Sequence, residues 1–260
     1  MIIDTHAHLD DKRYEDDLDE VIKRAKENGV EGVLIPGADI DDLKRAKEIA
    51  WRYEHVFYAA GVHPYHCEQY SEDTLRKFLS DSRCIAVGEC GLDYFRLPED
   101  LEEKERVKKE QQEVFKKHIE LAISVNKPLI VHVRDANDDS KRVLLENGAS
   151  KVGGVLHCYN ASPHLLDLAN EGFYFGIGGV LTFKNAKNLV EILPKIPKDK
   201  IIVETDAPYL TPHPHRGKRN EPSYTRLVVK KIAEILNMSE DEVEQLTTKN
   251  AKRVFKEFIK

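Results

Sequence analysis

The sequence is poor in the features that mark secreted, membrane-spanning and zinc-finger proteins. Among its 260 residues there are four cysteines, and none of them forms a Cys-x-x-Cys pair. No apolar run approaches the roughly 18 residues that a membrane-spanning helix needs, and the acidic N-terminal segment lacks the basic and apolar regions of a secretory signal. We therefore expect a cytoplasmic protein with reduced thiols, no membrane association and no obligate protein partner.

An excess of basic residues is also missing, because 40 Lys and Arg stand against 46 Asp and Glu and give a formal net charge of −6. This balance argues against a large surface that coats nucleic acid. It still allows a local basic groove, or a site whose positive charge comes from metal ions. Apolar residues make up 41% of the chain, and no Pro-, Gly- or Ser-rich linker divides it. These features predict one domain over residues 1–260.

Short apolar segments recur about every thirty residues, in the pattern of parallel strands that are covered on both sides. The expected strands are residues 2–8, 30–36, 56–63, 84–92, 128–134, 153–159, 173–178 and 201–206. Amphipathic helical patterns cover residues 41–53, 71–79, 102–125, 140–147, 163–170, 185–193, 223–236 and 239–258. Ser239 and Glu242 are spaced as a capping box at the start of the last helix.

Eight strands that alternate with eight helices predict an α/β fold, a single (β/α)8 or TIM barrel. A doubly wound open sheet is the alternative. It is disfavoured because no glycine-rich phosphate loop follows the first expected strand.

Ionisable residues stand at the ends of several expected strands, where a barrel places its active site. His6 and His8 alternate with Ala7, so both rings point to one side of the strand. The other residues of this kind are His63, Glu89, His132, His157, Glu204 and Asp206. A single histidine in an apolar strand is more often a hydrogen-bonded core or rim residue, but so many ionisable groups at one rim need neutralising charge. Mixed imidazole and carboxylate ligands suit zinc or manganese, with magnesium less typical.

The same segments carry a family resemblance. DTHAHLD, GVHP, GECGLDY, PLIVHVRDA, VLHCYNAS and VETDAPYLTP occur in this order. Together they resemble the TatD family of metal-dependent deoxyribonucleases, which belongs to the amidohydrolase-like group of barrel hydrolases. The resemblance extends from Ile2 to the region of Phe255. GECGLDY and ETDAP are specific motifs, whereas His-x-His alone is not.

This resemblance implies a site for two divalent ions. His6, His8 and Asp206 would bind one ion, His132 and His157 would bind the other, and Glu89 would bridge both. Asp206 would also accept the proton of the attacking water, and Glu204 would orient a metal-bound histidine. Glu89 stands where many related hydrolases have a carboxylated lysine, so their substrates do not transfer to this chain. His118, where relatives often have glutamine, is interpreted as structural.

The substrate that the resemblance implies is DNA, cleaved from a single-stranded or frayed end and bound mainly through its phosphates. The residues expected to bind it are His63, Tyr94, Arg134 and Arg216, the last in a basic loop at residues 213–220. His63 would contact phosphate or protonate the departing oxygen, or else it caps the loop before Pro64. Cys90 and Cys158 are expected to face away from the site.

Two alternatives remain open at this point. The first is a metal-dependent hydrolase of esters or amides on the same scaffold, because one barrel supports many chemistries. The second is a metal-binding or interaction protein without catalysis, which the complete ligand set and the presence of a base disfavour.

Overall fold

Eight parallel strands form the centre of the molecule in the computed structural model, which describes residues 1–259. Each strand pairs with the next one in the sequence. Their bounds are β1 Ile2–Asp4, β2 Val30–Ile35, β3 Val56–Ala60, β4 Cys84–Asp93, β5 Leu129–Arg134, β6 Gly154–Leu156, β7 Phe173–Ile177 and β8 Ile201–Val203. The segments that follow β1 and β8 pair with each other and close the barrel, because the Thr5 amide donates to the Val203 carbonyl (3.2 Å) and Ala7 forms a β-bridge with Ala207. The structure is therefore the predicted TIM barrel and not an open sheet.

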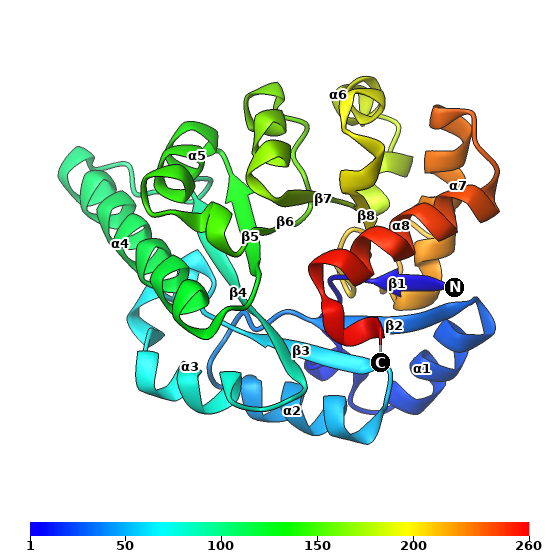
Figure 1. Ribbon diagram of the computed structural model, residues 1–260, viewed down its shortest axis with the longest axis horizontal. Coiled ribbons are helices and arrows are strands. Elements are labelled where there is room, and N and C mark those ends of the chain that lie inside the picture. The colour runs from blue at the N-terminus through cyan, green and yellow to red at the C-terminus, as the bar shows by residue number, and fades with distance from the viewer. Residues whose placement is uncertain (260) are drawn as a thin grey trace.

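Helices surround these strands, and α8 crosses in front of them in Figure 1. Their bounds are α1 Leu18–Glu27, α2 Leu43–Arg52, α3 Glu72–Leu79, α4 Leu101–Val125, α5 Asn137–Glu146, α6 Lys187–Ile192, α7 Thr225–Leu236 and α8 Glu240–Val254. The predicted capping box of Ser239 and Glu242 is present at the start of α8. Within residues 1–259, no helix is both long enough and apolar enough to cross a membrane.

Three helical predictions differ from the structure. Helix α1 was not predicted, because the acidic segment before it obscures its short apolar stripe of Leu18, Val21, Ile22 and Ala25. Residues 163–171 form a 3-10 helix instead of an α-helix. The predicted last helix stops at Val254, and a separate 3-10 turn follows over Lys256–Ile259. The last residue of the predicted domain, Lys260, lies outside the described residues.

A compact apolar cluster fills the barrel at the amino-terminal ends of the strands. Its members include Ile3, Leu34, Ile85, Ile130, Val155, Ile202 and Phe255. Phe255 follows α8, is fully buried and packs against these strand residues, so it closes this end of the barrel. Because strand side chains alternate, the residues two positions after Ile130, Val155 and Ile202 also face inward, but at the opposite end. Those residues are His132, His157 and Glu204.

Candidate metal centre

The side chain of Glu89, at the inner surface of β4, lies among the four histidines predicted as ligands, and His63 Nε2 is also 3.8 Å from its Oε1 atom. Its Oε1 atom is 3.1 Å from His132 Nδ1 and 3.4 Å from His157 Nε2. Its Oε2 atom is 3.3 Å from His6 Nε2 and 3.8 Å from His8 Nε2. The two oxygens of one buried carboxylate therefore face two different pairs of imidazoles.

Asp206 completes the group on the side of β1. Its Oδ1 atom is 3.5 Å from His8 Nε2 and 3.7 Å from His6 Nε2. Asp206 has a left-handed backbone with φ of 56°, which is uncommon for a residue other than glycine and occurs often at functional sites. Its amide donates to the His6 carbonyl (2.8 Å), which fixes the aspartate against the strand that carries the His-x-His pair.

The chemistry of His6 fits a bound cation. Its ring is fully buried, and neither ring nitrogen has a hydrogen-bond partner among the described residues. Burial, reinforced by neighbouring His157, lowers the pKa of His6, so the ring is neutral and keeps a lone pair for a ligand bond. Unpaired polar atoms are costly in a protein interior. A divalent ion between His6, His8, Glu89 and Asp206 would accept the lone pair of one ring nitrogen of His6 and neutralise the carboxylates.

The structure thus brings together all six residues that the resemblance assigns as ligands. Atoms of five of them fall into two sets that could each hold an ion, His6 with His8 and Asp206, and His6 with Glu89 and His157, whereas His132 is in a different set from His157. The rings of His6 and His157 are stacked, with centroids 3.6 Å apart, so the two sets adjoin each other. The assignment of each residue as a ligand remains a prediction that metal-binding measurements would test.

Asp93 is a functional candidate that the sequence reasoning missed. Its Oδ2 atom is 2.8 Å from His132 Nε2, and its Oδ1 atom accepts hydrogen bonds from Tyr65 and from the Phe95 amide. Burial alone would lower the pKa of His132, but the hydrogen bonds to Asp93 and Glu89 raise the pKa to about 9. A third set of possible ligands, His63, Asp93 and His132, includes this carboxylate. Because its oxygens already have partners, we assign Asp93 to orienting His132. Its position four residues after Glu89, at the end of the same strand, was the available signal.

Glu204 is placed as predicted, beside a histidine of the site. Its Oε1 atom is 3.3 Å from His157 Nδ1 and accepts a hydrogen bond from the Cys158 amide (2.5 Å). Gly176 on β7 makes room for it, because a Cβ atom there would lie 2.2 Å from Glu204 Oε2.

The prediction for Cys158 is wrong: this residue lines the cleft instead of facing away from the site. Strand alternation fails there because Cys158 has a φ of 45°. Cys90 is buried in the apolar layer, as predicted.

A cleft of about 770 Å³ opens above these residues at the carboxyl ends of the strands. His63 and Arg134, two of the predicted substrate-binding residues, line it. Tyr94 does not line the cleft, because its hydroxyl donates to Asp139 and accepts from Gln112, toward helices α4 and α5. Arg216 also lies outside the lining; its guanidinium covers Phe183 and donates to the Thr211 carbonyl.

The predicted basic loop at residues 213–220 is largely occupied with structural contacts. Arg219 forms an ion pair with Asp17 and covers the ring of Tyr14. The Lys218 carbonyl accepts a hydrogen bond from the Thr211 hydroxyl (2.6 Å). These contacts hold the loop against the residues just before it and against the first segment of the chain, which is distant in sequence. The arginines that line the cleft are instead Arg96 and Arg134.

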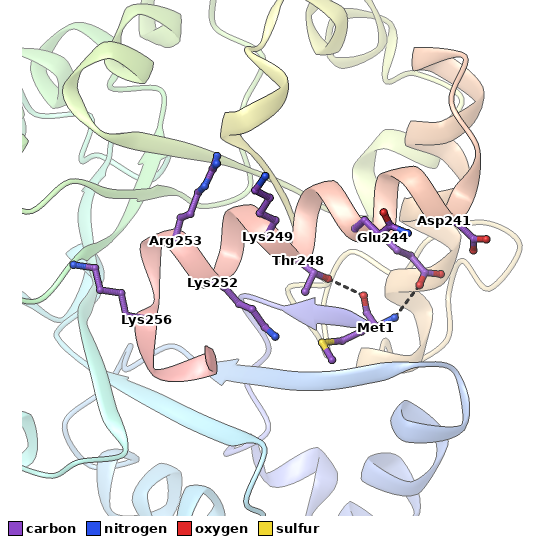
Figure 2. Close-up of a pocket in the computed structure, with 9 residues that line it drawn as sticks. Met1, Asp241, Glu244, Thr248, Lys249, Lys252, Arg253 and Lys256 are labelled. Carbon is purple, nitrogen blue, oxygen red and sulfur yellow. Dashed lines mark hydrogen bonds and ion pairs between the residues drawn. The ribbon is translucent and has the colours of Figure 1, made fainter. Parts of the chain in front are cut away.

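A larger hollow of about 1010 Å³ lies beside α8 (Figure 2). The amino group of Met1 pairs with Glu244 (3.0 Å), and the Thr248 hydroxyl donates to the Met1 carbonyl (2.7 Å). Its lining includes the basic residues Lys249, Lys252, Arg253 and Lys256. All the possible metal-ligand sets found among the described residues lie instead in or below the smaller cleft, so size does not identify the functional site.

The chain is similar to known proteins over its whole length. The sequence profile of the family described as TatD related DNase matches residues 3–256. An uncharacterized metal-dependent hydrolase of Bacillus subtilis, YabD, is 42% identical, over 98% of this chain and 99% of its own. The 3'-5' ssDNA/RNA exonuclease TatD of Salmonella typhimurium is 32% identical over 98% of both chains. The crystal structure of YJJV, a TatD homolog from Escherichia coli, has a TM-score of 0.88 and 27% identity over 98% of both chains.

Proposed function

Because the chain belongs to the TatD family of metal-dependent hydrolases, we propose that it cleaves phosphodiester bonds of DNA, starting from a single-stranded or frayed end. The Salmonella typhimurium relative, a 3'-5' ssDNA/RNA exonuclease, supports this substrate class. The cleft supports it too, because its floor contains the candidate metal ligands and one of its walls contains Arg96 and Arg134.

The observation that carries the proposal is the position of Glu89 between two pairs of histidines. In this arrangement His6, His8 and Asp206 would hold one divalent ion, His132 and His157 would hold a second, and Glu89 would contribute its charge to both. Zinc, manganese and magnesium are the candidates. Two such ions supply positive charge to the oxygens of a phosphodiester and make a water molecule more acidic.

Asp206 is suited to accept a proton from the attacking water. Burial alone would raise its pKa, but contact with His8 and the proximity of His157 and His6 lower the pKa below its usual value. The carboxylate is therefore ionised at neutral pH, and it lines the cleft from which the substrate approaches.

His63 is suited to donate a hydrogen bond to a phosphate oxygen. Its Nδ1 atom accepts from the Tyr65 amide (3.1 Å), so in the neutral ring Nε2 carries the proton. Nε2 points toward the site and lies 3.8 Å from Glu89 Oε1. Burial lowers the pKa of His63 to about 3, which keeps the ring neutral. His63 both caps its loop and presents a donor, and a proton donor to the departing oxygen would have to be another group.

The shape of the mouth favours a flexible strand over a continuous duplex. Four of the candidate ligands follow their strands, and Glu89 and His132 lie in the carboxyl-terminal halves of β4 and β5, below the loops that follow the strands. A scissile phosphate must descend between these loops, which a stiff helix would do only after local melting. We therefore expect digestion from ends, and weak sequence preference because phosphate contacts carry no sequence information.

End-labelled single-stranded and double-stranded DNA, together with covalently closed circular DNA, would test the proposal in the presence of each candidate metal. We expect a ladder of shortened products from linear DNA and no cleavage of closed circles. The Glu89→Gln variant serves as the inactive control. Its activity should fall by more than about 100-fold, because changing a residue that only hydrogen-bonds to a metal ligand already costs up to about 100-fold. Rapid cutting of closed circles would contradict digestion from ends. Brisk hydrolysis of a carboxyl ester without action on DNA would favour the ester and amide alternative.

A further inference from the structure

The two sides of the cleft differ in chemistry. Tyr65, Arg96 and Arg134 follow or end strands β3, β4 and β5 and line one side. The opposite side of the barrel contributes Val180, Asn185, Ala186, Asn188 and Leu189 from the segment between β7 and the end of α6, and Leu210 after β8. Because the eight strands follow sequence order around the barrel, β3 to β5 lie across from β7 and β8.

The first side is cationic, and its charges are not neutralised by protein carboxylates. Among the described residues, neither Arg96 nor Arg134 has a carboxylate within ion-pair distance. Each guanidinium instead covers an aromatic ring: Arg96 is 5.4 Å from the ring centre of Tyr65, and Arg134 is 3.6 Å from that of Phe95. An aromatic ring covers only one face of each guanidinium. The N–H groups at the edge of the guanidinium remain available for phosphate oxygens.

Apart from Asp206, which belongs to the candidate metal centre, and Tyr209, the second side contributes apolar side chains and two amides to the lining. Asn185 and Asn188 are exposed, and no hydrogen bond of either amide to another described residue is found. Val180, Ala186 and Leu189 lie beside them. Apolar surface beside free amide donors and acceptors matches the flat face and polar edge of a nucleobase.

We propose that the wall formed by Val180, Asn185, Ala186, Asn188, Leu189 and Leu210 binds the nucleobase next to the scissile phosphodiester, while Arg96 and Arg134 bind a further phosphate of the strand. This inference rests on the proposed phosphodiesterase function and adds a subsite for the base to it. The ligand is a nucleotide unit bound across the cleft, with its base on one side and its phosphates over the candidate ligands and the arginines.

Two substrates with the same leaving group would test the base subsite: thymidine 5′-p-nitrophenyl phosphate and methyl p-nitrophenyl phosphate. The measured quantity is the ratio of their kcat/KM values with the metal-loaded protein. We expect the natural protein to prefer the thymidine ester at least tenfold, and the double variant Asn185→Ala, Asn188→Ala to lose most of that preference. Lys187→Ala is the matched control and should retain the preference, because Lys187 lies between the two asparagines, is exposed and does not line the cleft.

Binding provides a second measurement. Thymidine 5′-monophosphate should inhibit more strongly than methyl phosphate, and the difference should shrink in the double asparagine variant. For the opposite wall, Arg96→Ala with Arg134→Ala should raise KM for a thymidine tetranucleotide more than KM for the thymidine ester. Equal kcat/KM values for the two esters in the natural protein, or an unchanged ratio in the asparagine variant, would overturn the base subsite alone. Absence of hydrolysis of both esters and of DNA would instead overturn the proposed function.

Discussion

At the scale of single residues, Asp93 decides which nitrogen of His132 faces the candidate metal centre. The carboxylate accepts from His132 Nε2 (2.8 Å), so in the neutral ring that a metal ion requires, Nδ1, which is directed at Glu89, is the nitrogen without a proton. In the Asp93→Asn variant, one oxygen still serves Tyr65 and the Phe95 amide, and the NH₂ group then opposes the His132 N–H. The ring must change tautomer, and the proton moves to the nitrogen needed by the metal.

We therefore expect Asp93→Asn to weaken metal binding by about 10- to 100-fold, as measured by calorimetric titration with Mn²⁺ or Zn²⁺. Tyr65→Phe is the matched control, because it removes one hydrogen bond to the same carboxylate and leaves the carboxylate in place. Its effect should be clearly smaller. Unchanged metal affinity in Asp93→Asn would show that Asp93 does not orient His132.

His118 gives a pH prediction that is independent of the metal centre. Its Nε2 atom accepts from the Val62 amide (3.0 Å), and its Nδ1 atom contacts the Val114 carbonyl (2.8 Å). Burial lowers the pKa of His118 to about 4. The unfolded chain binds a proton near pH 6.5, whereas the folded protein resists it, so this stabilisation is complete above pH 6.5 and is lost as the pH falls toward 4.

When the pH falls from 7 to 5, the titration of His118 should lower the free energy of unfolding by about 2 kcal/mol. His118→Gln retains an acceptor and a donor without the titrating ring, so its stability should fall less over the same interval. Urea unfolding at both pH values, in the natural protein and the variant, measures the difference. Equal losses in the two proteins would mean that His118 does not contribute to the acid sensitivity.

At the scale of elements, strand β7 makes room for Glu204, the residue after β8, through the absence of a side chain at Gly176. Gly176 faces the barrel interior, where the buried Glu204 carboxylate occupies the space that a Cβ atom would take. We expect Gly176→Ala to displace this carboxylate from His157 and from the Cys158 amide, at a cost of about 1–3 kcal/mol in unfolding free energy. Metal affinity should fall as well, because His157 loses the group that orients it.

Gly178→Ala is the control for this prediction, since it lies two residues further along and a Cβ atom there has no neighbour closer than 3.5 Å. Thermal unfolding and metal titration of both variants would separate a steric effect on Glu204 from a general intolerance of alanine. If both variants behave alike, the contact between Gly176 and Glu204 does not determine the orientation of His157.

The same scale shows which features were predictable from the sequence. Strand periodicity predicted the barrel, and the order of motifs at the strand ends predicted the group around Glu89. Prediction became poor where regular strands end. Cys158 turns into the cleft because of a left-handed backbone, and Tyr94 turns away from it to meet Asp139. Arg219 pairs with Asp17 across most of the sequence, and no local pattern reveals such a contact.

At the scale of the whole molecule, the barrel separates stability from function along its axis. The apolar cluster that Phe255 closes fills the amino-terminal end, and the ionisable residues gather at the carboxyl end. Burying Glu89, His6 and Asp206 together is unfavourable unless their charges and lone pairs are matched. The protein should therefore depend on divalent ions for stability as well as for activity.

We expect elemental analysis and titration to give two divalent ions per chain, and we expect chelation to abolish phosphodiesterase activity and lower the melting temperature. Each ion at a concentration 100-fold above its dissociation constant should add about 2.7 kcal/mol of stability, because it binds the folded state alone. Calorimetric scans with and without metal would measure this gain, and Glu89→Gln should show a smaller one because it lacks the charge between the two ions. Full activity in protein shown to be free of metal would contradict the mechanism. A gain in Glu89→Gln equal to that of the natural protein would instead contradict the position of Glu89 between two ions, which is the geometric feature on which the two-ion assignment depends.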